Sequence, residues 1–141
     1  MAHKVLFSVP KAVTVTHHPE SHACMATWSD LSAPCFRDAC TRGISGCRAL
    51  RAKSWIVNLT EPNPGVPSQS DLRWIESDLI PIAHDAGVLA VINVHGASAV
   101  ASMGAKRWNK LVTGGGLTTY DCATVSDALA LAKEIGEGKE G

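Results

Sequence analysis

Two serines lie where a helix is expected to begin, and their chemistry can be read from spacing. Asp71 follows Ser68 by three residues, the spacing of a capping box in which the serine hydroxyl accepts a backbone N–H. Helix N-termini also stabilise negative charge, so Ser68 and Ser70 are candidate phosphoacceptors, with capping alone as the alternative. Trp74 follows one turn later. We therefore predict a partner-binding surface formed by Ser68, Ser70, Asp71 and Trp74.

A second candidate position is the end of a central strand, at His95 and Gly96. Open α/β sheets bind ligands at the carboxyl ends of their strands, so these two residues are predicted as a ligand edge. Imidazole and thiolate groups also gather around one turn, at His17, His18, His22 and Cys24. They lack a second ligand pair at the spacing of structural zinc sites, so we predict a solvated turn with a buried cysteine and no metal.

The cysteines are five in number and contain no C-x-x-C pair, which is typical of reduced thiols rather than a disulfide framework. A catalytic thiolate would need a cationic, partly open setting, with His84 or His95 as its base. We expect instead that Cys35, Cys40 and Cys47 lie on the apolar stripe of a helix and act as small hydrophobes. We predict no catalytic residue and no cofactor.

Composition argues against a nucleic-acid-binding, membrane-spanning or secreted protein. The chain has 141 residues, and its 13 basic and 13 acidic residues cancel, so no net charge favours nucleic acid or an anionic membrane. A small basic face at Lys106, Arg107 and Lys110 has no interleaved aromatics and is a weak nucleic-acid signal. No apolar run approaches the roughly 20 residues of a membrane span, and no secretory signal is seen. We expect one cytoplasmic domain over residues 1–135 and a flexible tail over 136–141.

Two apolar runs, 54–60 and 88–94, predict the strands that position these residues. Their composition indicates strands buried on both faces of a parallel sheet. Between them, apolar residues at spacings of three and four predict a helix over 71–86 that ends at Gly87. Strand, helix and strand form a right-handed crossover with the two strands as neighbours. Pro81 removes a helical hydrogen bond to Ser77, so we expect a kink there.

The remaining elements flank this crossover. Residues 4–8, 12–16 and 22–28 read as an antiparallel meander, with a tight connection at Pro10 and Lys11. A helix should begin near residue 31, where caps and Pro34 occur, and continue to Leu50. Further helices are expected over 97–112 and after Thr124, with a strand over 117–121 between them. The predicted fold is α/β: antiparallel N-terminal strands, parallel core strands and packed helices in the order βββαβαβαβα.

This order and several local motifs resemble the SpoIIAA-like, or STAS-like, family of small bacterial proteins related to anti-sigma-factor antagonists. The motifs are Leu59 at a strand end, the stretch 68–71, Trp74-Ile75, Pro81 and Gly87, continued by Asp127-Ala-Leu129. The resemblance spans roughly residues 5–135. It departs from the phosphorylatable members, which carry an Asp-Ser-Ser/Thr-Gly type motif at this helix; here residues 61–67 form a proline-rich approach, and no glycine follows the serines.

The resemblance and the residues together favour a non-enzymatic regulatory module that binds another bacterial cytosolic protein. The alternative is a small-molecule or lipid carrier with an apolar pocket between the kinked helix and the sheet, and a homodimer is compatible with either. An enzyme comes third, because no catalytic constellation can be assembled.

Overall fold

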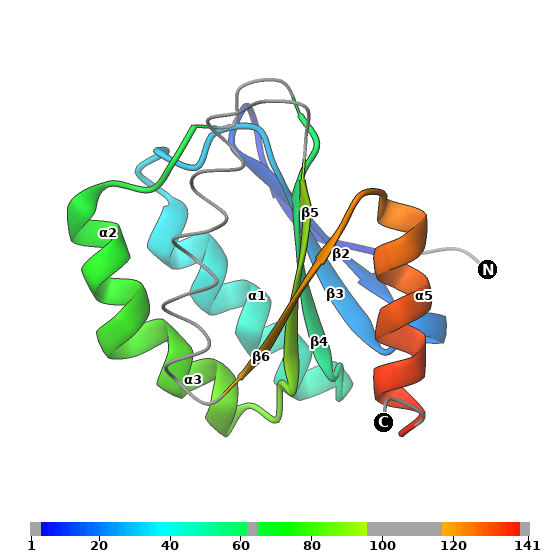
Figure 1. Cartoon of the computed structure of the whole chain (residues 1–141). Helices are drawn as coiled ribbons and strands as arrows, with labels where there is room; N and C mark the ends of the chain where they lie inside the picture. The colour runs from blue at the N-terminus through cyan, green and yellow to red at the C-terminus, as the bar shows by residue number, and fades with distance from the viewer. Residues whose placement is uncertain (1–3, 62–64, 96–116, 139–141) are drawn as a thin grey trace.

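The computed structural model describes residues 4–61, 65–95 and 117–138, which form a six-stranded mixed sheet with helices on both faces (Figure 1). The strands are β1 (Lys4–Val9), β2 (Val13–His18), β3 (Ala23–Trp28), β4 (Ser54–Leu59), β5 (Ala90–His95) and β6 (Thr118–Cys122). Their order in the sheet follows the chain. The pairs β1–β2 and β2–β3 are antiparallel, and every pair from β3 to β6 is parallel. The predicted mixed α/β sheet is confirmed. The predicted helix over 97–112 lies outside the described residues.

The N-terminal meander forms as expected. Lys11, with a φ of 63°, turns the chain between β1 and β2, and the N–H of Ala12 donates to the carbonyl of Val9 at 3.0 Å. The second connection is a 3-10 turn, η1 (Pro19–Ser21), after which His22 adopts the left-handed conformation. The second strand was predicted to end at residue 16, but His17 and His18 also belong to β2, so the turn that follows is shorter than expected.

The central crossover is confirmed, with β4 and β5 as parallel neighbours. Every residue of β4 is buried, as expected for a strand covered on both faces. Gly87, at a φ of 89°, ends the helix between them, and the N–H of Val88 reaches back to the carbonyl of Ala83 at 3.1 Å. The helix is longer than predicted and β5 begins two residues later than predicted.

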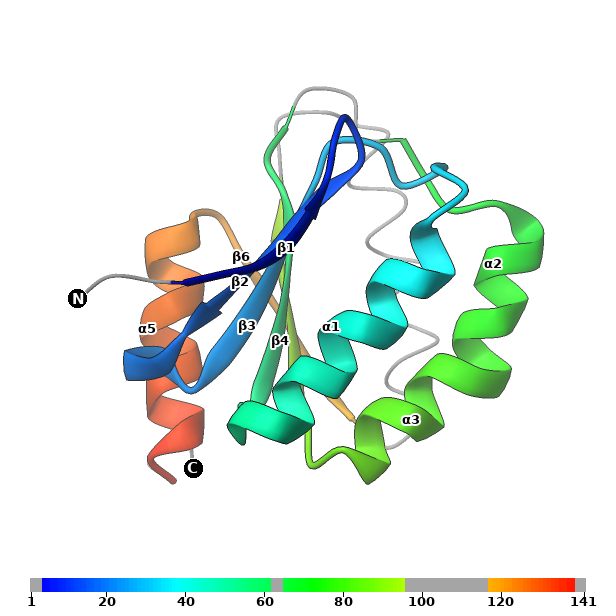
Figure 2. The same cartoon turned by 180° about the vertical axis from the view of Figure 1, so that it is seen from behind.

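This crossover helix has three consecutive segments: α2 (Gln69–Trp74), a π-turn η2 (Ile75–Leu79) and α3 (Ile80–Asp85). In the π-turn the N–H of Ile80 donates to the carbonyl of Ile75, five residues back. Pro81 lies in the first turn of α3, where a missing N–H is best tolerated. Figure 2 shows α2 and α3 as one continuous coil beside α1 (Phe36–Leu50).

The first helix begins later than predicted, at Phe36 rather than near residue 31. The Asp30 carboxylate accepts hydrogen bonds from the N–H and the hydroxyl of Ser32, at 2.9 and 2.6 Å. This local turn competes with a helical start, and residues 31–35 remain turns and bends. The inward face of α1 is buried from Phe36 to Cys47, whereas Leu50, the last helical residue, is 41% exposed. The helix ends at this point, because Arg51 adopts the left-handed conformation with a φ of 57° and turns the chain away.

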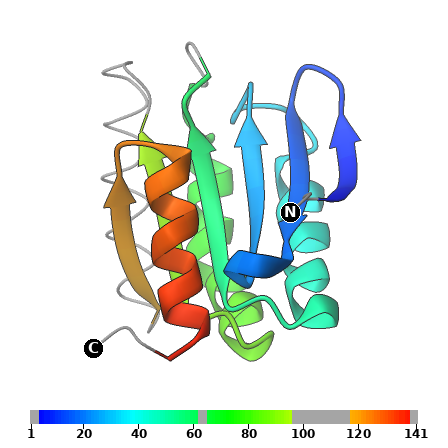
Figure 3. The same ribbon diagram turned by 90° about the vertical axis from the view of Figure 1, so that its right-hand side faces the viewer.

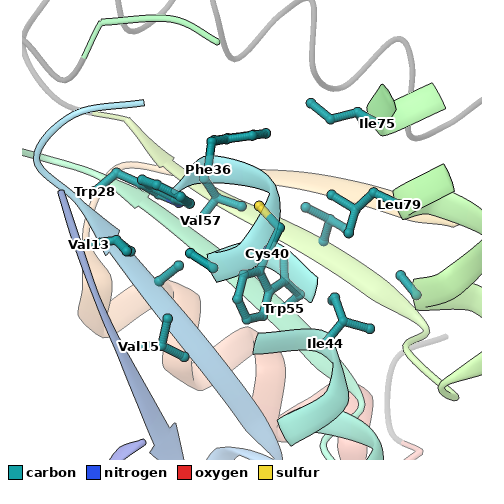
Figure 4. Close-up of a cluster of buried hydrophobic side chains, with 14 of the residues drawn as sticks. Val13, Val15, Trp28, Phe36, Cys40, Ile44, Trp55, Val57, Ile75 and Leu79 are labelled. Carbon is teal, nitrogen blue, oxygen red and sulfur yellow. The ribbon is translucent and has the colours of Figure 1, made fainter. Parts of the chain in front are cut away.

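The larger core lies between the sheet and the face covered by α1, α2 and α3. Trp28, Phe36 and Trp55 are its largest side chains, and each is at most 3% exposed (Figure 4). Gly43 of α1 lies directly over Trp55: a Cβ built on it would come within 2.3 Å of the indole ring. The missing side chain therefore lets α1 dock closely, which offsets the roughly 1 kcal/mol that a helical glycine costs.

On the opposite face, α5 (Val125–Gly136) crosses the sheet beside β6 (Figure 3). Its expected inward residues Ala128, Ala132 and Ile135 are buried, and Leu129 is half-buried. Thr124 caps this helix as predicted, its hydroxyl accepting the N–H of Asp127 at 3.1 Å. None of the described helices combines the length and apolar character that a membrane crossing needs.

Beneath α5, the hydroxyl of Ser54 is fully buried and has no hydrogen-bond partner among the described residues. Its neighbours across the sheet are Ala23 and Ala90, neither of which offers a side-chain acceptor. We expect Ser54→Ala to raise the free energy of unfolding by about 1 kcal/mol, because it removes an unsatisfied buried hydroxyl without opening a cavity.

Thr16 provides a matched control for urea unfolding of both variants. Its hydroxyl is also buried, but it lies 2.8 Å from Nε2 of His18. Thr16→Val should lower the free energy of unfolding by about 1 kcal/mol, because the partner loses its hydrogen bond. A loss of stability in Ser54→Ala equal to that in Thr16→Val would contradict the prediction.

Candidate functional site

The predicted partner-binding residues lie along the start of α2. Ser68 is the N-cap, and its hydroxyl accepts the backbone N–H of Asp71 at 3.0 Å, so its capping role is confirmed. Ser68 and Ser70 are exposed, whereas Asp71 and Trp74 are half-buried. The serines thus have different local roles: one hydroxyl is committed to its own helix, and the other is turned toward a neighbouring element.

That neighbour is Arg37 in the first turn of α1, a residue that the sequence analysis did not identify. Its Nε donates to Oδ1 of Asp71 at 2.7 Å, and its Nη2 donates to Oγ of Ser70 at 2.6 Å. Its Cζ lies 5.7 Å from the centre of the Trp74 ring, within the range of a cation–π contact. One guanidinium therefore joins three of the predicted residues. We call Arg37, Ser68, Ser70, Asp71 and Trp74 the α2 surface.

Topology contains the only signal that could have identified Arg37. Two successive crossovers, from β3 to β4 and from β4 to β5, place α1 and α2 on the same face of the sheet. Right-handed parallel crossovers lead to this arrangement, and it brings the first turn of α1 beside the first turn of α2. Which side chain of α1 would face Asp71 depended on where that helix begins, and the predicted start was too early.

Trp74 is neither a free surface side chain nor a core residue. Its ring meets Phe36 edge to face, with centroids 6.3 Å apart and planes at 76°. Phe36 in turn lies 5.2 Å from the ring of Trp28, which is 2% exposed. Three aromatic rings in a row therefore connect the sheet to the α2 surface. The indole of Trp74 packs against Phe36 on one side and contacts the guanidinium of Arg37 on another.

Two thiols, those of Cys35 and Cys40, lie at the start of α1 near this surface. Burial, and then the carboxylate of Asp71 and the thiol of Cys35, raise the pKa of Cys40 far above its ordinary value, so its thiol stays protonated. Cys35 is half-buried and precedes the helix as its N-cap residue, without a side-chain capping bond. The expectation that Cys40 and Cys47 lie buried on the α1 stripe is confirmed, and Cys35 is outside it.

The predicted ligand edge falls where the description of the chain stops. His95 is the last residue of β5 and pairs with Leu59, while Gly96 lies outside the described residues, as do Trp108 and the basic face at Lys106, Arg107 and Lys110. The ligand edge therefore stays a prediction.

The histidines near the meander point in different directions. His17 lies opposite Cys24, and the next pair in register, His18 with Ala23, faces the other side of the sheet. His22 lies under the end of α5, where a Cβ on Gly136 would come within 2.5 Å of it. His22 and Cys24 therefore lie on opposite faces of the sheet. Within the described ranges, no three His, Cys, Asp or Glu side chains gather in a way that would hold a metal ion.

A small apolar cavity lies between the crossover helix and the sheet. It is lined by Ile44, Trp55, Leu79, Ile80, Ala83, Val91 and Leu117. Its volume of about 10 Å³ is room for about one water molecule. This space would have to expand many times before it could hold the ligand of a carrier protein.

Comparison of the chain with protein-family models, with curated proteins and with solved structures found no match. The likeness to STAS-like proteins accordingly rests on the short motifs and the element order of this chain.

Proposed function

We propose that this protein is a non-enzymatic regulatory module that binds another cytosolic bacterial protein through the α2 surface, in the manner its likeness to the STAS-like family implies. The observation that supports this best is the Arg37 guanidinium, which contacts Ser70, Asp71 and Trp74 at once on an exposed part of the molecule. The specific STAS-like arrangement of the fold is part of the same proposal.

The residue types suit a protein contact. Trp and Arg are the side chains that most often dominate binding energy at interfaces, particularly when they are held in place before binding. Here Phe36 supports the indole, and the bonds to Ser70 and Asp71 fix the guanidinium. A partner would therefore meet side chains whose conformational freedom is already reduced.

The surface is also sensitive to charge. The side chain of Arg37 is 45% exposed and that of Asp71 is 16% exposed, so the ion pair is partly solvated and its strength is reduced by solvent screening. A phosphate on Ser70 would add about −1.5 to −2 charge beside the guanidinium and compete with Asp71 for it. Because Ser68 is engaged as the cap, Ser70 is the better phosphoacceptor of the two.

The test is affinity for a partner captured from native cytosol. We expect Arg37→Ala and Trp74→Ala each to weaken binding about 30-fold, the effect of losing a dominant interface residue. Ser70→Asp should also change the affinity, because its carboxylate would face Arg37 and Asp71. Isothermal titration calorimetry of each variant gives the dissociation constants, and circular dichroism shows whether the variant is folded.

Arg42 supplies a matched control on the same helix. It is exposed, but its guanidinium lies 4.1 Å from the centre of the Phe7 ring, in contact with β1 rather than α2. Arg42→Ala should leave the affinity unchanged. Folded Arg37→Ala and Trp74→Ala proteins that bind as tightly as the unmodified chain would refute the proposed surface.

A further inference from the structure

The guanidinium of Arg37 uses only part of its hydrogen-bonding capacity within the α2 surface. Arginine has five N–H donors in one rigid plane. The bonds to Asp71 and Ser70 use the donor on Nε and one of the two on Nη2. The two donors on Nη1 and the second donor on Nη2 have no acceptor among the residues that the structure describes. Because Arg37 is exposed, a ligand can reach these three donors from solvent.

The same bonds fix the guanidinium before a ligand arrives. Asp71 and Ser70 accept from it at 2.7 and 2.6 Å, and the Trp74 ring lies beside it, with 5.7 Å between Cζ and the ring centre. Hydrogen bonds from a guanidinium to a carboxylate are among the strongest in proteins, and they cost less when the side chain is already held in place. The remaining donors of Arg37 therefore suit a carboxylate from another molecule.

A second cation, Arg73, lies on the same helix as the serines. It follows Ser70 by three residues, and Trp74 follows Ser70 by four, so both lie one helical turn from that serine. Arg73 is exposed and takes part in neither of the ion pairs found in the described part of the chain. Glu76, three residues further on, is not within ion-pair distance of it. The charge of Arg73 is thus available to a ligand.

The carboxylates near the two arginines do not neutralise both of them. Asp71 pairs with Arg37. Asp38, the residue after Arg37 in α1, has its carboxylate 3.7 Å from the guanidinium of Arg42, one turn further along that helix. Arg73 consequently adds positive charge that these carboxylates leave unpaired, although the whole chain has no net charge. A partner with complementary charge would be acidic at this position.

We propose that the segment of the partner bound at the α2 surface is acidic, an inference that rests on the proposed function. One carboxylate of this segment accepts hydrogen bonds from the remaining donors of Arg37, and another lies close to Arg73. This chemistry gives the effect of phosphorylation a sign. A phosphate on Ser70 would lie against the same guanidinium and repel the carboxylates of the partner, so the modification releases the partner.

The first experiment needs no identified partner. The full chain, labelled with nitrogen-15, is titrated with a short glutamate peptide with blocked ends, at about 50 mM salt, where charge contacts are weakly screened. We expect the Nε–H signal of Arg37 and the backbone amide signals of residues 70–74 to shift until they saturate. Arg37→Gln should weaken peptide binding about tenfold, through loss of charge-assisted hydrogen bonds. Arg73→Gln should weaken it about threefold, the effect of one exposed charge pair.

Arg42→Gln is the matched control, because Arg42 is an exposed arginine of α1 that contacts Phe7 and Asp38 instead of α2. It should bind the glutamate peptide as the unmodified chain does, and a lysine peptide of equal length should cause none of these shifts. Equal weakening by all three glutamine substitutions would overturn the proposal, because charge alone would then attract the peptide. Shifts at Arg42 as large as those at Arg37 on the unmodified chain would overturn it too, whether or not the variants fold.

The partner captured from cytosol separates this inference from the function on which it rests. Its dissociation constant should rise when salt is raised from about 50 to about 500 mM, and the rise should be smaller for Arg73→Gln, which has lost one charge contact. Ser70→Asp should weaken binding. Binding that Trp74→Ala weakens, but that neither salt nor Arg73→Gln changes, would retain the interface and overturn the acidic segment. Unchanged binding by folded Arg37→Ala and Trp74→Ala proteins would overturn the proposed function, and this inference with it.

Discussion

Phe36→Ala should lower the free energy of unfolding by about 3–5 kcal/mol, because it empties the middle position of the row of three rings. Phe36 is 3% exposed and contacts Trp28 on one side and Trp74 on the other. Its removal opens a cavity beneath Trp74 and takes away two aromatic contacts. Urea unfolding followed by tryptophan fluorescence measures the loss.

Phe36→Leu separates volume from aromaticity. Leucine fills most of the space, so this variant should lose about 1 kcal/mol, the amount attributable to the ring contacts. Partner affinity should fall more in Phe36→Ala than in Phe36→Leu if the row supports the α2 surface. Equal stabilities of the alanine and leucine variants would show that the cavity is filled by movement of the neighbouring helices.

Gly43→Ala is the second large effect, a loss of about 2–3 kcal/mol from a single added methyl group. The new Cβ would lie 2.3 Å from the Trp55 ring, which is 2% exposed and packed within the larger core. Alanine would favour the helix itself by about 1 kcal/mol, so the overpacking must exceed that gain. Thermal and urea unfolding of the purified variant give the difference.

Gly46→Ala is the matched control, since it makes the same substitution one turn later in the same helix. Its Cβ would meet only the end of the Leu6 side chain, at 3.0 Å, and this flexible group can move aside. We expect this variant to be unchanged or slightly more stable. The smaller ring of Trp55→Phe should restore part of the stability of Gly43→Ala. Additive effects of these two substitutions would locate the strain elsewhere.

Strand positions were predictable because burial on both faces leaves a strong pattern. The apolar runs at 54–60 and 88–94 specified β4 and β5 as well as their adjacency, through the length of the helix between them. Helix starts were less predictable, because they depend on local side-chain bonds. Asp30 shows this: it lies just before the predicted helix start, yet its carboxylate accepts hydrogen bonds from Ser32 in a turn that delays α1.

The candidate site was predictable only where its contacts are local in the sequence. The cap at Ser68 is a contact within one helix turn, and the spacing to Asp71 specified it. The contacts of Arg37 join residues 33 and 34 positions apart, and no periodicity along the chain encodes such a contact. The half-buried state of Trp74 could not be predicted from the sequence either, because it depends on contact with Phe36 in another helix.

The π-turn within the crossover helix has a consequence for comparing this chain with others. A π-turn holds one residue more than an α-helical turn, and here it is bounded by the buried residues Ile75 and Leu79. Deleting one exposed residue of this turn, such as Glu76, would give an unbroken α-helix with its inward positions still in phase on both sides. A homologous chain whose helix is regular should therefore be one residue shorter between Ile75 and Leu79. An alignment without a single-residue gap there would match the inward residues of one helix to outward residues of the other.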